Sequence, residues 1–246
     1  MDTESRENEA LGPRLAWRPA AAPSRQALAG RYGQLVPVDP ARHAHDLFEA
    51  SHGAGGDPAI WNYLGYGPFP DEAAFAVWLA ERAATRDPLF FAVLDGRTGR
   101  ALGMASYLRI VPADGVIEVG HIWLAPALQR TRLATEAIFL MARHAFETLG
   151  NRRFEWKCNA LNAPSRRAAI RFGFTFEGLF RQHMIVKGRN RDTAWYAMLD
   201  RDWPAIRQAF EAWLDPGNFD AQGRQHRPLA ARDAAGPSPL ADPVLN

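Results

Sequence analysis

The stretch WLAPALQRTRLATEAIFLMARHAF, residues 123–146, leads from a strand into a helix. The apolar strand ends at Pro126, and the polar residues from Gln129 to Arg132 precede a helical pattern that begins near Thr131. Apolar side chains then recur every three or four residues, so one face of this helix is expected to pack on a sheet. A helix start offers unpaired N–H groups and the positive end of the helix dipole. With two arginines beside it, the junction is either a solvated connector or a site for a phosphate.

The composition is typical of one globular domain with irregular ends. Of the 246 residues, 47% are hydrophobic and eight are tryptophan, which fits a chain that buries a core. Residues 1–28 and 215–246 are rich in charge, alanine or proline and show no apolar period, so both are expected to be poorly ordered. The domain is therefore predicted to span residues 29–214, a length sufficient for a single core.

The cellular location is predicted from composition alone. The apolar runs are much shorter than the roughly 18 residues that a membrane span needs, and the N-terminus is acidic and polar, with no apolar signal region. A single cysteine, Cys158, excludes an internal disulfide and fits a reducing compartment. We expect a cytoplasmic protein with no membrane partner.

Apolar periods and turn residues divide the domain into strands and helices. The turn GRTG at 96–99 between two apolar runs indicates a hairpin, and a second hairpin is expected around KGRN at 187–190. The element order is β-α-α-β-β-β-α-β-α-β-β, which predicts a mixed α/β fold with about seven strands and about four helices. Expected strands cover 33–39, 89–95, 101–111, 116–126, 152–160 and the two arms of the last hairpin; expected helices cover 41–52, 71–86, 131–149 and 162–172.

Four stretches, in this order, resemble motifs of the GCN5-related N-acetyltransferases, abbreviated GNAT. They are IEVGHIWLAP at 117–126, QRTRLATEA at 129–137, NAPSRRAAIRFGF at 162–174 and EGLFRQHMIVKGRNRDTAWYAML at 177–199. The resemblance extends from about Gly33 to Trp203 and points to the ribosomal-protein-alanine acetyltransferase-like branch. It implies a mostly antiparallel sheet and an enzyme that moves an acetyl group from acetyl-CoA, its cosubstrate, to a primary amine without a metal. The amine would belong to a small molecule or a protein N-terminus and would attack directly in a ternary complex.

The resemblance also assigns the residues around the loop between strand and helix to the cofactor. The family pattern Gln/Arg-x-x-Gly-x-Gly/Ala begins at Gln129, with Arg132 where a glycine is usual. Backbone N–H groups would hold the pyrophosphate, and the side chain of Arg130 or Arg132 would neutralise it. The full set expected to bind the cofactor through this loop is Gln129, Arg130, Thr131, Arg132, Leu133, Ala134 and Thr135.

The pantetheine arm of the cofactor has its own expected partners. By the same resemblance, the backbone of Ile122, Trp123 and Leu124 would pair with it, and Asn162 would bond to it from the start of the next helix. In the segment Asn-Ala-Pro-Ser, Asn162 also stands where helix caps prefer asparagine, and Pro164 lies in the first turn. Both roles are open, and one residue can fill both.

Glu118 is the first candidate for the general base. Strand alternation puts it on one face with Gly120 and Ile122, among apolar neighbours that would raise its pKa. A bulge, common in this strand of the family, would exchange the faces after it. A solvated or ion-paired glutamate is the structural alternative, and His121 is the competing base.

The general acid is less clearly marked. Many relatives carry a tyrosine seven residues after the asparagine, but this chain has Ala169 there. By resemblance to the ribosomal-type branch, Ser165 would donate a proton to the departing thiolate or orient the sulfur. The alternative is an ordinary first-turn serine. Cys158, in an apolar strand, is interpreted as a core residue.

The acceptor pocket is expected between the aromatic loop IWNYLGYGPFP, residues 60–70, and the last hairpin, because the family builds it there. Trp61, Tyr63, Tyr66 and Phe69 would form its walls, and Asp192 would meet a cationic amine. Loop packing and a turn-capping aspartate are the structural alternatives.

Two other functions are compatible with the sequence. Residues 150–191 contain ten Lys/Arg and two Glu, which admits a nucleic-acid-binding module, although nucleic acid is not the expected partner because no known binding motif accompanies the charge. A non-catalytic acyl-CoA-binding regulatory protein is the alternative suggested by the missing glycine and tyrosine. A homodimer remains open.

Overall fold

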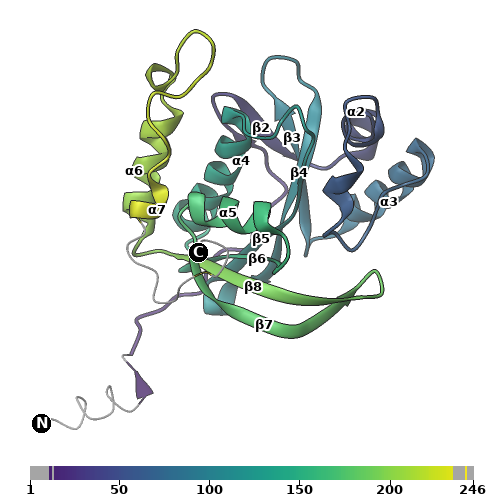
Figure 1. The fold of residues 1–246 in the computed structure, drawn as a ribbon. Coiled ribbons are helices and arrows are strands. Elements are labelled where there is room, and N and C mark those ends of the chain that lie inside the picture. The colour runs from purple at the N-terminus through teal and green to yellow at the C-terminus, as the bar shows by residue number, and fades with distance from the viewer. Residues whose placement is uncertain (1–10, 13, 235–241, 243–246) are drawn as a thin grey trace, which may run out of the picture.

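An eight-stranded sheet with the order β1-β2-β3-β4-β5-β6-β8-β7 forms the centre of the computed structural model, which describes residues 11–12, 14–234 and 242 (Figure 1). Among the described strands, β5 and β6 run parallel and the other neighbours run antiparallel. The strands are β1 Leu28–Ala29, β2 Gly33–Pro37, β3 Leu89–Asp95, β4 Ala101–Val111, β5 Val116–Leu124, β6 Arg153–Asn159, β7 Thr175–Val186 and β8 Arg189–Leu199.

Helices cover both faces of this sheet. They are α2 Pro40–His52, α3 Glu72–Ala84, α4 Arg132–Arg143, α5 Ala163–Arg171, α6 Trp203–Leu214 and α7 Ala231–Ala234, with a 3-10 turn Pro58–Trp61 and a π turn His144–Thr148 that continues α4. The predicted mixed, mostly antiparallel α/β fold is confirmed. The structure adds the two-residue strand β1 and the helix α6 to the expected order, and the predicted long helix over 131–149 changes to π geometry in its last turn.

Two apolar cores lie on opposite faces of the sheet, and Figure 1 shows the helices that cover these faces, α4 and α5 on one side and α2 and α3 on the other. The larger packs α4, α5 and α6 on strands from β2 to β8 and includes the buried side chains of Ile117, Val119 and Phe154. The smaller packs α2 and α3 on β3, β4 and the end of β5, and it includes Trp61 and Trp123. The smaller core covers β3, β4 and the end of β5. On the same side of the sheet, β6 and β7 carry charged side chains such as Arg153, Lys157 and Glu177.

Capping residues start the helices where the sequence offers oxygen acceptors. Asp39, Asp71 and Thr131 accept from backbone N–H groups in the first turns of α2, α3 and α4. Buried Glu136, one turn into α4, accepts from the N–H groups of Arg31, Tyr32 and Gly33 at 2.6, 2.8 and 3.2 Å. This carboxylate therefore attaches the start of α4 to the turn between β1 and β2.

The described parts of both flanking segments differ from the expectation of poorly ordered ends. In the N-terminal segment, the N–H groups of Ala20 and Ala21 donate to the carbonyls of Pro112 and Leu149. In the C-terminal segment, Leu229 and Ala231 are buried against the larger core. Neither segment shows a periodic pattern of apolar residues. Such a pattern is not needed here, because each segment packs on the surface of a domain that is already folded. Residues 1–10, 13, 235–241 and 243–246 lie outside the described residues.

Candidate active site

The parallel strands β5 and β6 separate before they end. Their pairing runs from Val116 opposite Arg153 to Val119 opposite Trp156, whereas β5 continues to Leu124 and β6 to Asn159. The edge of β5 that faces β6 is therefore unpaired beyond Val119. An extended ligand with amide groups fits such an edge, because it can complete the missing backbone hydrogen bonds.

A bulge in β5 lies at this opening. Opposite β4, Gly120 pairs with Ser106 and Trp123 with Met104, so His121 and Ile122 face the single residue Ala105, and His121 has a φ of 50°. The bulge exchanges the faces of the strand, as the alternative reading of this segment anticipated. Trp123 consequently packs in the smaller core, although simple alternation would put it with Val119 in the larger one.

A cavity of about 220 Å³ occupies the opening. It gathers groups from six parts of the chain: the aromatic loop, β4, β5, the end of β6, the start of α5 and the last hairpin. The residues selected from the sequence that line it are Tyr63, Glu118, His121, Ile122, Asn162 and Ser165.

Glu118 is a buried carboxylate within a chain of alternating charges. Its Oε2 is 2.8 Å from Nζ of Lys157 and 3.3 Å from Nε of Arg109. Lys157 Nζ is also 2.5 Å from Glu155, whose other oxygen binds Arg153. The side chains of Glu118 and Lys157 are 6% and 5% exposed. Burial raises the pKa of Glu118 above its ordinary value even though the charge and hydrogen bond of Lys157 oppose the shift.

His121, the competing base, lines the same cavity, but its ring packs among aromatic side chains. Its ring stacks on Tyr66 at 5.7 Å between centroids and lies 5.1 Å from Phe90. Burial, assisted by the charges of Arg82 and Arg191, lowers the pKa of His121 to about 4. A neutral imidazole of such low basicity is a weaker proton acceptor at neutral pH than a carboxylate with a raised pKa. The two opposite pKa shifts therefore favour Glu118 over His121 as the candidate base.

Asn162 and Ser165 begin α5 at the rim of the cavity. Asn162 is the N-cap, with its side-chain oxygen accepting from the Ser165 N–H at 3.2 Å, and it lines the cavity as well. Ser165 Oγ accepts from Nε1 of Trp156 at 3.0 Å. Burial raises the pKa of the nearby Cys158 thiol to about 11, which suits the interpretation of this residue as part of the core.

The loop that begins α4 is held in a defined shape. The Gln129 side chain donates to the carbonyl of Leu124 at 3.0 Å, and Arg130, which is exposed, has a left-handed φ of 61°. Thr131 caps the helix by accepting from the Ala134 N–H at 3.1 Å. This bond occupies one of the N–H groups expected to reach the pyrophosphate. The N–H groups of Arg132 and Leu133 open the helix and lie beyond the reach of its own carbonyls.

The side chain of Arg132 does not extend from this loop toward the cavity. Its guanidinium lies between the rings of Tyr32 and Phe219, 4.8 Å from each centroid. The position that is glycine in the family pattern thus carries a side chain that stacks on aromatic rings, a use for which the planar guanidinium is suited. Its backbone N–H remains at the first turn of the helix.

Three of the aromatic residues expected to form the acceptor pocket, Trp61, Tyr66 and Phe69, are part of the smaller core or pack against it. Trp61 is fully buried against Trp123 and Phe69, and Tyr66 packs on Trp78. Tyr63 does face the cavity, and its hydroxyl donates to the carbonyl of Leu161 at 3.1 Å. Aromatic residues in a Gly/Pro loop look alike in sequence whether they pack inward or line a pocket.

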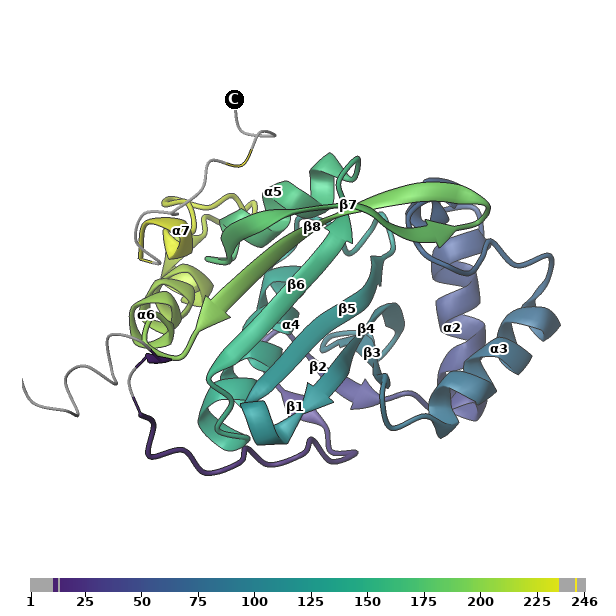
Figure 2. The ribbon, with the colours of Figure 1, turned by 90° about the horizontal axis from the view of Figure 1, so that it is seen from below.

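The last hairpin closes over the aromatic loop. Lys187 at its tip donates through Nζ to the carbonyls of Trp61 at 2.9 Å and Gly67 at 2.6 Å. Figure 2 shows the β7–β8 hairpin reaching across toward α2. Asp192 is not brought to the cavity with its neighbours; its carboxylate accepts from the Gln182 N–H and the Asn190 side chain, which is the turn-capping alternative.

The sequence analysis did not select the basic side chains that line the cavity besides His121, which are Arg109, Lys157, His183 and Arg191. A signal for Lys157 exists, because Arg153, Glu155 and Lys157 alternate with apolar residues along β6 and mark a charged face. The sequence did not reveal which of the many basic residues between 150 and 191 would converge on the cavity.

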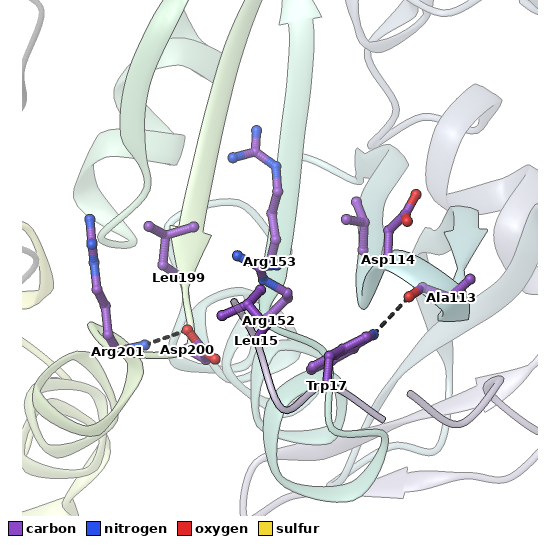
Figure 3. A pocket seen from close by; sticks show the side chains of 10 residues that line it. Leu15, Trp17, Ala113, Asp114, Arg152, Arg153, Leu199, Asp200 and Arg201 are labelled. Carbon is purple, nitrogen blue, oxygen red and sulfur yellow. Dashed lines mark hydrogen bonds between the residues drawn. The ribbon is translucent and has the colours of Figure 1, made fainter. Parts of the chain in front are cut away.

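A second cavity, of about 570 Å³, lies at the opposite end of β5, β6 and β8 beneath the N-terminal segment (Figure 3). Trp17 covers it and donates to the carbonyl of Ala113 at 2.7 Å. Among the arginines that line it, Arg153 forms ion pairs with Glu155 and Glu177. Because the residues selected for catalysis and cofactor binding lie elsewhere, the smaller cavity beside Glu118 is the candidate active site.

Comparisons with known proteins agree with this geometry. A family model described as the acetyltransferase (GNAT) domain matches residues 34–175, more than half of the chain. The chain is 47% identical to a GCN5-related N-acetyltransferase of Brucella melitensis whose crystal structure superposes with a TM-score of 0.86, covering 89% of this chain and 99% of that one. A probable GNAT-family acetyltransferase of Chromobacterium violaceum is 48% identical with a TM-score of 0.72, covering 78% and 96%.

Curated relatives are more distant. The chain is 30% identical over 98 residues to the ribosomal-protein-serine acetyltransferase of Escherichia coli, an alignment that covers 40% of this chain and 54% of the relative. It is also 30% identical over 105 residues to a putative ribosomal N-acetyltransferase of Bacillus subtilis, covering 43% and 57%. The chain thus spans little more than half the length of these two relatives.

The mixed α/β fold with its opened parallel strand pair matches that of solved GNAT-family structures. The chain belongs to the GNAT acetyltransferase family, which confirms the prediction made from its four motifs. In the part of the chain that the structure describes, no helix combines the length and apolar character of a membrane span.

Proposed function

We propose that the protein transfers an acetyl group from acetyl-CoA to a primary amine by direct attack, with both substrates bound in the cavity. One observation carries the proposal: the pairing of β5 and β6 stops at Val119, and the cavity at that point holds a buried carboxylate, an asparagine and a serine. The unpaired edge at Ile122, Trp123 and Leu124 suits the amide groups of pantetheine, and Asn162 can bond to the same arm.

The phosphates would bind at the start of α4. The N–H groups of Arg132 and Leu133 and the positive end of the helix dipole favour an anion there. Arg130 is the nearby arginine whose side chain remains exposed, because that of Arg132 is stacked between two rings. We therefore assign charge neutralisation to Arg130 and backbone contacts to Arg132. Gln129 and Thr131 fix the shape of the loop, and Ala134 and Thr135 follow in the first turns of the helix.

The chemistry requires a neutral amine, a base and a place for the proton. Glu118 accepts the proton of the amine as the nitrogen–carbon bond forms, and the carbon–sulfur bond breaks to release the thiolate of CoA. Ser165, at the start of α5, lies where it can orient the sulfur or return a proton to it. An α-amino group, with an ordinary pKa of about 7.7–8.0, needs less help from a base than a lysine amine near 10.4.

Replacing Arg130 by glutamate is expected to weaken CoA binding about tenfold, because a negative charge would then stand beside the phosphates. In a thermal-shift titration, wild-type protein at a hundred times its dissociation constant gains about 2.7 kcal/mol of stability, and the variant needs correspondingly more CoA. Arg189→Glu makes the same charge change on the hairpin and should leave CoA binding unaltered. Equal CoA affinity in all three proteins would contradict the assignment of Arg130.

The acceptor is the part of the function that most needs an experiment. The names of two relatives refer to ribosomal proteins, which supports an acceptor at a protein N-terminus. Incubation of the protein with acetyl-CoA and a library of amines and peptides, read by mass spectrometry and by thiol release, tests this directly. Acetylated products establish the enzyme. Tight CoA binding without any product would favour the non-catalytic regulatory protein instead.

A further inference from the structure

The acceptor side of the cavity carries more positive than negative charge. Arg109 enters it from β4, Lys157 from β6 and Arg191 from β8, whereas Glu118 is the carboxylate among the residues that line it. Tyr63 of the aromatic loop lines the same cavity. Because the starts of α4 and α5 are assigned to the cofactor in the proposed reaction, these cations of the strands are the ones available to the amine substrate.

Two of these cations already have carboxylate partners. Lys157 lies between Glu118 and Glu155, and Arg109 is 3.3 Å from Glu118. Arg191 is different: within the described residues, no carboxylate lies within 4.0 Å of its guanidinium, and Nε donates to Oγ1 of Thr193 at 3.2 Å. Its sequence neighbour Asp192 is occupied elsewhere, by the Gln182 N–H and the Asn190 side chain.

Arg191 is also only partly accessible to water. Burial lowers its pKa from the ordinary arginine value, although the negative charges of Cys158 and Glu118 oppose the shift. A desolvated guanidinium keeps its charge and presents up to five hydrogen-bond donors. An anion bound in the cavity would therefore stabilise it. The positive charge of Arg191 also assists burial in lowering the pKa of His183 across the hairpin, which leaves that ring neutral at pH 7.

From this geometry we infer that the acceptor carries a carboxylate or phosphate group close to its amine, and that Arg191 binds this anion. The inference rests on the proposed function, since it concerns the second substrate of that reaction. The positive charges of Arg109, Lys157 and Arg191 would then have two effects. They attract the acid group of the acceptor, and they disfavour its ammonium form, so that the amine loses its proton more easily.

Binding of matched acceptors in the presence of CoA tests the inference. One pair is the dipeptide amides Ser-Asp-NH₂ and Ser-Asn-NH₂, and the other is phosphoethanolamine and ethanolamine. Calorimetric titration of the wild type is expected to show at least about tenfold tighter binding of the acidic member of one pair, because hydrogen bonds to charged groups are the stronger kind. The pair that responds distinguishes a carboxylate from a phosphate.

The dependence on Arg191 is checked with three variants. Arg191→Gln is expected to abolish the preference for the acidic member, and Arg191→Lys to restore part of it. Arg189→Gln, at an exposed position on the same strand, is expected to keep it. The thermal shift of each variant with CoA alone shows that the protein is folded and that the cofactor side is intact.

The outcomes separate the inference from the function. Equal binding of both members of both pairs by the wild type overturns the inference, as does a preference that survives in Arg191→Gln. Neither result bears on transfer itself, which is read independently by thiol release with the same four amines. Selective, Arg191-dependent binding without thiol release would retain the anion site and refute the proposed catalysis.

Discussion

Replacement of Glu118 by glutamine is expected to lower the rate of acetyl transfer by about 10²–10⁴-fold, the usual range for loss of a general base. The amide keeps the shape and polarity of the side chain but cannot accept the proton of the amine. CoA binding should persist, because Glu118 is not among the groups assigned to the phosphates or the pantetheine. Steady-state rates of thiol release, with a CoA thermal shift on the same preparation, measure both effects.

The pH dependence gives an independent readout for the same residue. Because burial raises the pKa of Glu118, the fraction of active base in the wild type rises with pH through a range above the ordinary glutamate value. That rising limb should be absent in Glu118→Gln. Glu177→Gln, an exposed glutamate paired with Arg153 on the same face, serves as the control and should retain both the rate and the limb. A Glu118→Gln enzyme with the wild-type profile would remove Glu118 from the mechanism.

Replacement of Lys157 by methionine is expected to lower the free energy of unfolding at pH 7–8 by about 3–5 kcal/mol, the usual cost of removing one partner of a buried ion pair. Glu118 and Glu155 are directly opposite each other in the parallel register, and Lys157 lies between their carboxylates. Without the ammonium group, two buried negative charges repel each other. Chemical denaturation at several pH values measures the loss.

The sign of the pH effect follows from the same charges. In the variant, the folded-state pKa of at least one of the two carboxylates must exceed its unfolded value, so the folded form binds a proton more tightly. Stability relative to the wild type is then regained as the pH falls through that raised pKa. Arg109→Gln is the matched control: Arg109 also contacts Glu118, but its side chain is 54% exposed, so its removal should cost at most about 1 kcal/mol. A loss of similar size in both variants, or one independent of pH, would contradict this account.

Local patterns were sufficient to predict the fold and one part of the site. Strand and helix periods gave the element order, and Glu118, Asn162 and Ser165, chosen from motifs, do line one cavity. Asn162 was expected either to cap a helix or to face the cofactor, and the structure shows the cap at the rim of the cavity. These features depend on residues that are close to one another in the sequence, so they can be predicted from one sequence alone.

Features that depend on long-range packing could not be predicted. Trp61 and Tyr66 were expected in the pocket wall, but the loop turns them into a core shared with Trp123, and only the bulge at His121 brings Trp123 to that side. The convergence of Lys157 and Arg191 requires the register between β6 and β8. No local pattern specifies which charged residues of two distant strands will meet.

The contact of Arg132 with Phe219 links the loop that begins α4 to the segment that follows α6. One residue at the start of α4 offers its backbone to the proposed phosphate site and its side chain to a segment that follows the last long helix. Tyr32, on the other side of the guanidinium, bonds through its hydroxyl to the Leu214 carbonyl at 2.7 Å. We expect a ligand that restrains this loop to suppress opening of residues 214–226, and by linkage opening of that segment is expected to weaken the ligand by the same factor. Amide hydrogen exchange with and without CoA would reveal this reciprocity as slower exchange far from the acyl group.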